Sequence, residues 1–284
     1  MKRQLLLLVV LIACSTRANA LVINERGELD TLNAYLAMRD KIDVCKHERI
    51  DSLYQEAAIS VNPFKVYKSL YLEYRCYNYD TALIYVENME REALPEQMPE
   101  VDLCRAFVYL SGGLFKEASD ILDGWEERYS AEQTRDLMLR YCVLYARLLW
   151  DMADQAGGMI GERYNAEGLS MNRRVQTYLT ERDTAYYWYA LAVMDLREGN
   201  YPRSIARCKA SLAATQPSVH DQAITASTLA YLYRITGDLQ AALHYYIEAA
   251  VCDIRSSTYE TVALRNVAEL LFEADETDLS DRYI

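Results

Sequence analysis

The chain has 284 residues, of which 51% are hydrophobic and 25% charged, so it is long enough for one or two domains with a large core. Its formal net charge of −12 argues against binding nucleic acid, because an acidic surface repels the phosphate backbone. Only 10 Gly and 5 Pro are present, which favours helices joined by few, short turns. The 24 Tyr suit interfaces between helices that are partly apolar and partly open to water.

Residues 1–20 have the pattern of a signal peptide. Lys2 and Arg3 form a basic start, and Leu5–Ala13 is a run of nine apolar residues, shorter than the ~20 residues that cross a bilayer. We therefore predict that the chain is exported to the periplasm, either soluble there or anchored to the membrane facing it.

Two processing sites compete within this segment. Ala18-Asn19-Ala20 fits cleavage before Leu21, whereas Leu11-Ile12-Ala13-Cys14 resembles a bacterial lipobox, in which Cys14 would be lipidated and become the mature N-terminus. Both alternatives stay open. We expect this chain to touch a membrane only through a lipid on Cys14 or through a segment downstream of residue 284.

Residues 21–60 form the predicted N-terminal segment, with one long amphipathic helix over residues 28–56. Apolar positions follow roughly one stripe among many charges: Leu29, Leu32, Leu36, Ile42, Ile50 and Leu53. A second helix is expected to begin after Asn62 as its N-cap, with Pro63 at the first helical position.

Residues 61–284 form the predicted repeat domain, and Ala226–Ile254 is its clearest unit. Around Gly237, which we expect at the turn, lie small residues at Ala230 and Ala242 and large ones at Leu229 and Tyr233. This is the pattern of a tetratricopeptide repeat: small residues let two helices approach closely, and large ones fill the space between them. The glycine permits the positive φ at which the first helix ends.

Leu239 lies two residues after Gly237, at the start of the expected second helix, and Tyr79, Phe115 and Tyr201 hold the same position in other units. The distance from Phe115 to Tyr201 is twice the usual period, so one unit is hidden between them. We assign it a first helix near 133–154, a longer turn at 157–161 and a second helix near 171–179. The sequence therefore predicts an all-α, tetratricopeptide-like solenoid of five to six helix pairs, preceded by the long N-terminal helix.

The last repeat is incomplete in this sequence. Asp281–Ile284 is expected to start a second helix that stops after about one turn, which leaves Leu270, Leu271 and Tyr283 without a covering helix. We expect that end to be covered by further chain or by a partner, and the chain to be the front part of a longer protein.

Two segments carry a family resemblance: RDKIDVCKHERIDSL (Arg39–Leu53) and KSLYLEYRCYNYDTALIYV (Lys68–Val86). They resemble a bacterial family with a signal peptide and periplasmic tetratricopeptide repeats, found at the front of membrane-spanning transcriptional regulators. In that family a membrane helix and a cytoplasmic coiled-coil region follow, and this sequence lacks both. The resemblance implies a sensing region, with the regulatory output in the longer relatives.

No constellation for catalysis is visible, and no cofactor or metal is expected. The only histidines, His47, His220 and His244, lie outside any HExxH context, and no GxSxG, P-loop or GxGxxG motif occurs. We interpret Lys46–Arg49 as a solvated helix face and residues 157–161 as a turn. The last set is expected to be buried free thiols rather than disulfides: Cys45, Cys76, Cys104, Cys142, Cys208 and Cys252.

A binding surface is the remaining candidate site. In such repeats the first helix of each pair lines the concave groove, and Tyr and Arg are common interface anchors. Five residues are predicted to point there: Tyr186, Tyr189, Arg197, Tyr231 and Arg234. We predict a non-catalytic module that binds a protein or peptide, as the periplasmic sensing part of a regulatory system. The alternative is a lipoprotein scaffold of an envelope assembly or nutrient-uptake complex.

Overall fold

The computed structural model describes residues 26–131, 134–180, 184–214 and 218–283, and these are helical with no strand. The predicted signal peptide, Cys14 and the two processing sites lie outside the described residues. No helix in the described part of the chain combines the length and the apolar character needed to cross a membrane.

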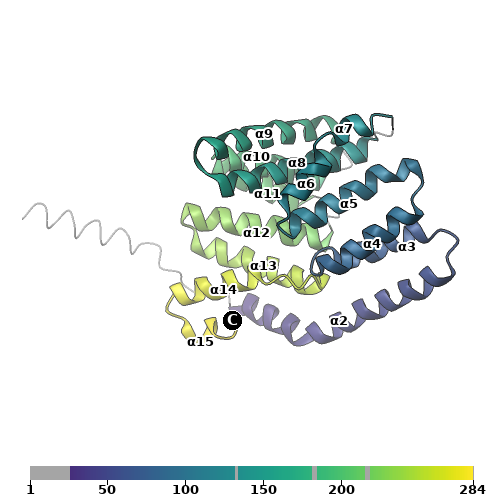
Figure 1. Cartoon of the computed structure of the whole chain (residues 1–284). Helices are drawn as coiled ribbons and strands as arrows, with labels where there is room; N and C mark the ends of the chain where they lie inside the picture. Colours follow the sequence, from purple (N-terminus) through teal and green to yellow (C-terminus); the bar gives the residue numbers. More distant parts are fainter. Residues whose placement is uncertain (1–25, 132–133, 181–183, 215–217, 284) are drawn as a thin grey trace, which may run out of the picture.

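Six helix pairs follow one long helix, α2 (Arg26–Ile59), as Figure 1 shows. The pairs are α3 (Pro63–Tyr74) with α4 (Tyr79–Glu92), α5 (Met98–Ser111) with α6 (Phe115–Leu122), α8 (Arg135–Ala156) with α9 (Gly158–Tyr178), α10 (Thr184–Arg197) with α11 (Tyr201–Leu212), α12 (Val219–Thr236) with α13 (Leu239–Ser256), and α14 (Val262–Glu273) with α15 (Thr277–Ser280). A 3₁₀ turn, η1 (Pro95–Gln97), precedes α5, and the short α7 (Trp125–Arg128) follows α6. This confirms the all-α solenoid predicted from the sequence.

The predicted slot after the turn begins the second helix in four pairs. Tyr79, Phe115, Tyr201 and Leu239 are the first residues of α4, α6, α11 and α13. At the end of α12, Gly237 has φ of +90°, in the left-handed region that a glycine adopts without strain. Local chemistry at the turns therefore sets the phase of the repeat.

The hidden unit is the pair α8 and α9, but its turn is shorter than predicted. Gly158 begins α9, so the expected turn over residues 157–161 is wrong, and so is the expected late start of the second helix near residue 171. The glycines inside α9 serve close packing instead. A Cβ on Gly161 would lie 2.7 Å from the Ala153 carbonyl oxygen, and one on Gly168 2.5 Å from Nε1 of Trp150.

Packing inside a pair follows the small and large slots. In α12 and α13, Ala230 and Ala242 are completely buried and belong to one apolar cluster. Leu229, on the neighbouring side of α12, is completely buried in a second cluster with Leu232, Ala192 and Cys208. Each helix thus buries faces toward its own pair and toward the preceding one, which makes the core continuous along the solenoid.

Helix α2 crosses from the first pair to the last and closes the solenoid into a ring (Figure 1). Its first turns bring Leu29 and Leu32 into the apolar cluster of α13 and α14, where both are buried. Its later turns pack Ile50 against Val66 and Leu70 of α3. The long N-terminal helix was predicted, whereas its contact with the last repeats was not.

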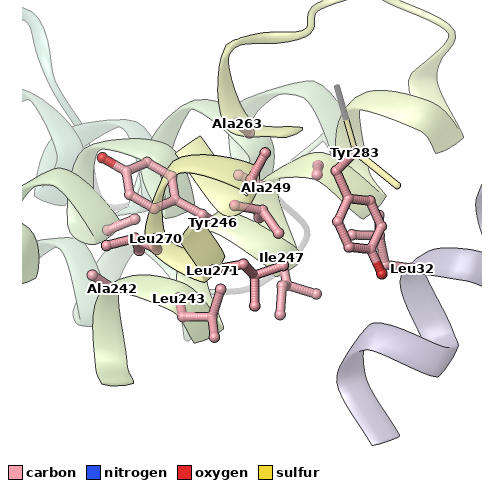
Figure 2. Close-up of a cluster of buried hydrophobic side chains, with 14 of the residues drawn as sticks. Leu32, Ala242, Leu243, Tyr246, Ile247, Ala249, Ala263, Leu270, Leu271 and Tyr283 are labelled. Atoms are coloured by element: carbon pink, nitrogen blue, oxygen red, sulfur yellow. The ribbon is translucent and has the colours of Figure 1, made fainter. Parts of the chain in front are cut away.

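This closure corrects the prediction that the last repeat is uncovered. Leu270 and Leu271 are completely buried, and Tyr283 is 4% exposed. Figure 2 shows Tyr283 beside Leu32 of α2, and the Tyr283 hydroxyl donates a hydrogen bond to Oδ1 of Asn33 over 3.1 Å. The final turn also begins at Thr277, earlier than the predicted start near Asp281.

Two local features depart from the usual pattern, one at a helix start and one within the repeat. Asn62 is the N-cap of α3 and Pro63 its first residue, but the Asn62 side chain makes no capping hydrogen bond. Trp188 stands 11 residues before the turn glycine Gly199, as the buried Ala226 does before Gly237, but it is 36% exposed and lies edge-on to Tyr187. The repeat's usual large residue is therefore at the surface here, and nothing in the structure explains it.

Candidate functional site

The inner side of the ring lines a partly open cavity of about 780 Å³. Its walls come mainly from the first helices of the pairs, α3, α5, α8, α10, α12 and α14, as expected for the concave face of such a solenoid. The loop between α13 and α14 adds Glu260, and the last turns of α13 add Asp253. We call this space the inner cavity.

Three arginines line the inner cavity, and we call them the basic cluster: Arg75 at the C-cap of α3, and Arg140 and Arg147 of α8. Arg75 and Arg147 both lie over the ring of Phe107, with Cζ at 5.2 Å and 5.7 Å from its centroid. A cation over an aromatic face is attracted by the ring quadrupole, so Phe107 holds two positive groups near each other.

The three arginines differ in their partners. Arg140 is paired with Glu100, which also holds Lys68, so its charge is compensated. The closest carboxylate contact of Arg147 is a loose 3.7 Å approach to Asp151. Within the described residues Arg75 forms no ion pair. The basic cluster therefore presents positive charge to the cavity at Arg75 and Arg147.

Carboxylates from other elements face the same space, and we call them the acidic cluster: Asp221 of α12, Asp253 of α13 and Glu260 of the following loop. Burial, reinforced by the negative charge of Glu260, raises the pKa of Asp253 to about 7. Among the described residues, no Lys, Arg or His lies within ion-pair distance of Asp253 or Glu260. This cluster is thus not neutralised by the basic one.

Tyrosines and hydroxyls complete the lining. Tyr186 and Tyr189 of α10 lie deep in the molecule, and the part of each side chain that remains exposed faces the cavity. Burial raises the pKa of Tyr189, so its phenol stays neutral near pH 7. Small polar side chains of α5 and α12 also reach the cavity: Ser111, Ser227 and Thr228.

The five residues predicted as the binding face are divided by the structure. Tyr186 and Tyr189 line the inner cavity. Arg197 and Tyr231 line a second hollow of about 740 Å³ beside the α8–α9 turn, where Arg197 is paired with Asp154 at 2.7 Å. Arg234 lines neither, because it is bound to Glu269 and Glu273 of α14. The five residues therefore do not line one common hollow, and their role in binding a partner stays a prediction.

Sequence reasoning missed the basic cluster. Arg140 and Arg147 are seven residues apart, a spacing that places both on one face of a helix, so a signal for them was present. Arg75 gave no such signal, because it lies at a helix end where periodicity stops.

The interpretation of Lys46–Arg49 as a solvated face is wrong for Lys46, which is 4% exposed. Its ammonium donates a hydrogen bond to the Ser257 carbonyl over 2.5 Å and lies 4.1 Å from the ring centroid of Tyr77 and 5.4 Å from that of Tyr259. Burial lowers the pKa of Lys46. Lys46 thus ties α2 to the loop that carries Glu260.

The six cysteines outside the predicted signal peptide are all free thiols, as predicted. Four are buried: Cys104, Cys142, Cys208 and Cys252. Cys45 is exposed on α2, which differs from the predicted burial, and Cys76 is partly buried with its Sγ 3.8 Å from Nε2 of His220. No group of three His, Cys, Asp or Glu side chains within the described ranges is placed to hold a metal ion.

The fold and the inner cavity define a tetratricopeptide solenoid closed by its own N-terminal helix. The family model described as the SusR N-terminal TPR domain matches residues 36–284. The chain therefore belongs to this family, which confirms the resemblance to tetratricopeptide regions at the front of regulators.

Two solved structures are similar. A thermophilic TPR protein from Thermus thermophilus, TTC0263, has a TM-score of 0.56 and 22% identity over 74% of this chain and 98% of that one. PilW, a type IV pilus biogenesis factor, has a TM-score of 0.48 and 16% identity over 79% and 91%. The first likeness supports the fold alone. A comparison with curated proteins found no match.

Proposed function

We propose that this chain is a non-catalytic binding module, the periplasmic sensing part of a regulatory system, and that it takes a peptide or a protein segment in the inner cavity. The observation that carries the proposal is the lining of that cavity. It combines aromatic rings, arginines and carboxylates that are not neutralised by one another. Such a mixture of apolar surface and a few fixed polar groups is typical of ligand sites.

Closure of the ring by α2 supports a sensing role in particular. The loop with Ser257 and Glu260 contacts α2 through Lys46 and also lines the cavity. A ligand that contacts Glu260 would act directly on a segment that holds α2. We propose Tyr186 and Tyr189 as partner-binding residues, with the hollow at Arg197 and Tyr231 outside the ligand site.

The test is photo-crosslinking in the native host. A photoreactive phenylalanine analogue replaces Tyr189 in the cavity or, as the matched control, Met159, which is 85% exposed on α9. We expect a peptide or protein adduct from position 189 and none from position 159. The same adducts from both positions would overturn the proposed site, and turnover of a small molecule by the purified chain would overturn the non-catalytic function.

Export is tested separately by intact mass. Material from the native host should begin at Leu21, or at Cys14 with two or three acyl chains. Acylation of Cys14 would favour the alternative, a lipoprotein scaffold, for which the lipobox-like Leu11–Cys14 is the specific observation. Retention of Met1 in the mature protein would refute both forms of export.

A further inference from the structure

The inner cavity contains charges of both signs that do not pair with each other. Arg75 has no ion-pair partner within the described residues, and the same holds for Asp253 and Glu260. All three line the inner cavity. Arg75 and Asp253 are half-buried and Glu260 is exposed, so each of these charges is accessible to a ligand, and the two signs together favour a ligand that carries both.

The size of the cavity limits that ligand. At about 780 Å³ it falls in the range of sites that hold small molecules, and the contact of Cys76 with His220 forms part of its wall. A ligand that reaches both Arg75 and Glu260 from inside this space is therefore short. It also contacts the aromatic rings of Phe107, Tyr186 and Tyr189, which line the same space.

We infer that the inner cavity binds a short peptide with both ends free, its terminal carboxylate at Arg75 and Arg147 and its terminal ammonium at Asp253 and Glu260. This rests on the proposed function and narrows it from a protein segment to a small zwitterionic peptide. The aromatic rings take the middle side chain, and Ser111 and Thr228 offer hydroxyls to the peptide amides. Arginine binds carboxylates through two parallel hydrogen bonds, which gives direction to the bound peptide.

The test uses calorimetry on the purified full chain with four probes: an equimolar mixture of Ala-Xaa-Ala tripeptides, the same mixture as C-terminal amides, the same mixture N-acetylated, and a neutral trisaccharide. We expect the free tripeptides to bind, and either blocking group to weaken binding by about tenfold or more, roughly the loss of one charge-assisted contact.

Two variants locate the ends. Arg75→Gln should weaken binding of the free tripeptides about tenfold and leave the already weak binding of the amides unchanged. Glu260→Gln should weaken binding of the free tripeptides about tenfold and leave the already weak binding of the N-acetylated tripeptides unchanged. Arg163→Gln is the matched control, because Arg163 is exposed on α9 and away from the cavity. Circular dichroism checks that each variant is folded.

Each contrary outcome is distinct. Equal binding of free and blocked tripeptides would overturn the assignment of the ends. Binding of the trisaccharide alone would overturn the peptide class. Adducts at position 189 from a long protein segment, with no tripeptide binding, would overturn this inference and leave the proposed function standing. Absence of both tripeptide binding and adducts would overturn the two together.

Discussion

The α12–α13 pair and helix α2 are in contact with each other, yet they are held in different ways. In the pair, buried residues recur from Ala223 to Leu232 in α12 and from Ala242 to Cys252 in α13, with small side chains at Ala230 and Ala242 against larger ones. Helix α2 is longer, but few of its side chains are buried, among them Leu29, Leu32, Lys46 and Ile50. Large apolar side chains such as Met38 and Val44 are about half exposed on it.

This difference shows two ways in which a sequence fixes a helix. The pair depends on contacts repeated along its whole length and close in the sequence. Helix α2 depends on a few contacts with residues more than 200 positions away, such as Lys46 with Ser257 and Asn33 with Tyr283. Sparse, distant contacts make α2 the element that is expected to open before the repeats unfold.

The largest effect is expected from Leu229→Ala in the pair. Leu229 is completely buried between α12 and the preceding repeat, so its removal leaves a cavity that the packed helices cannot fill. We expect the free energy of unfolding to fall by about 2–5 kcal/mol, measured by urea titration. Leu72→Ala, at a side chain 45% exposed on α3, is the control. A loss as small as that of the control would contradict the assigned packing.

Overpacking at the small slot should cost somewhat less. Ala242→Leu puts three more carbons where Ala242 is completely buried beside α12, and we expect a loss of about 1–3 kcal/mol in the free energy of unfolding. Ala241→Leu, one position along and partly exposed, should change it by less than about 0.5 kcal/mol. Equal midpoints for the two variants would show that the register of α13 is wrong.

Leu32→Ala should separate the two regions. Leu32 is completely buried against α13 and α14, but α2 can detach without unfolding the repeats. We expect the global free energy of unfolding to fall by only about 1–2 kcal/mol, because the main effect is local opening of α2. The rate of amide hydrogen exchange should rise in the first half of α2 and stay unchanged in α12. Met38→Ala, at an exposed position on α2, should change neither, and faster exchange throughout α12 would mean that α2 and the repeats unfold as one unit.

The repeats could be predicted from the sequence because their contacts are local. The residue that follows each turn, such as Phe115 or Tyr201, lies at a fixed distance from the small slots, and periodicity finds it. The closure could not be predicted in this way, since nothing periodic connects Asn33 with Tyr283. Tyr186 and Tyr189 line the cavity and could be predicted from their positions on the first helix of a pair. Arg197 and Arg234, predicted in the same way, instead form ion pairs with carboxylates of neighbouring helices.

The smallest and sharpest effect concerns Lys46, the polar contact of α2. Burial lowers the pKa of Lys46 in the folded protein, so the folded state holds this proton less tightly than the unfolded state, where the pKa is near the ordinary value of about 10.4. Between the lowered pKa and the ordinary one, the unfolded state binds more protons, and the contribution of Lys46 to stability rises with pH. Below both values the contribution does not depend on pH.

Lys46→Met keeps the length and apolar stem of the side chain but removes the proton. We expect the wild type to gain stability relative to this variant as the pH rises through that window, measured by urea titrations at several pH values. Tyrosines that do not contact Lys46 and whose pKa burial raises, such as Tyr129, destabilise both proteins equally in alkaline solution, so their contribution cancels in the difference. Lys41→Met, at an exposed lysine of α2, should give a flat difference across the same range. A flat difference for Lys46→Met as well would mean that the ammonium stays hydrated, and that α2 is held by its apolar ends alone.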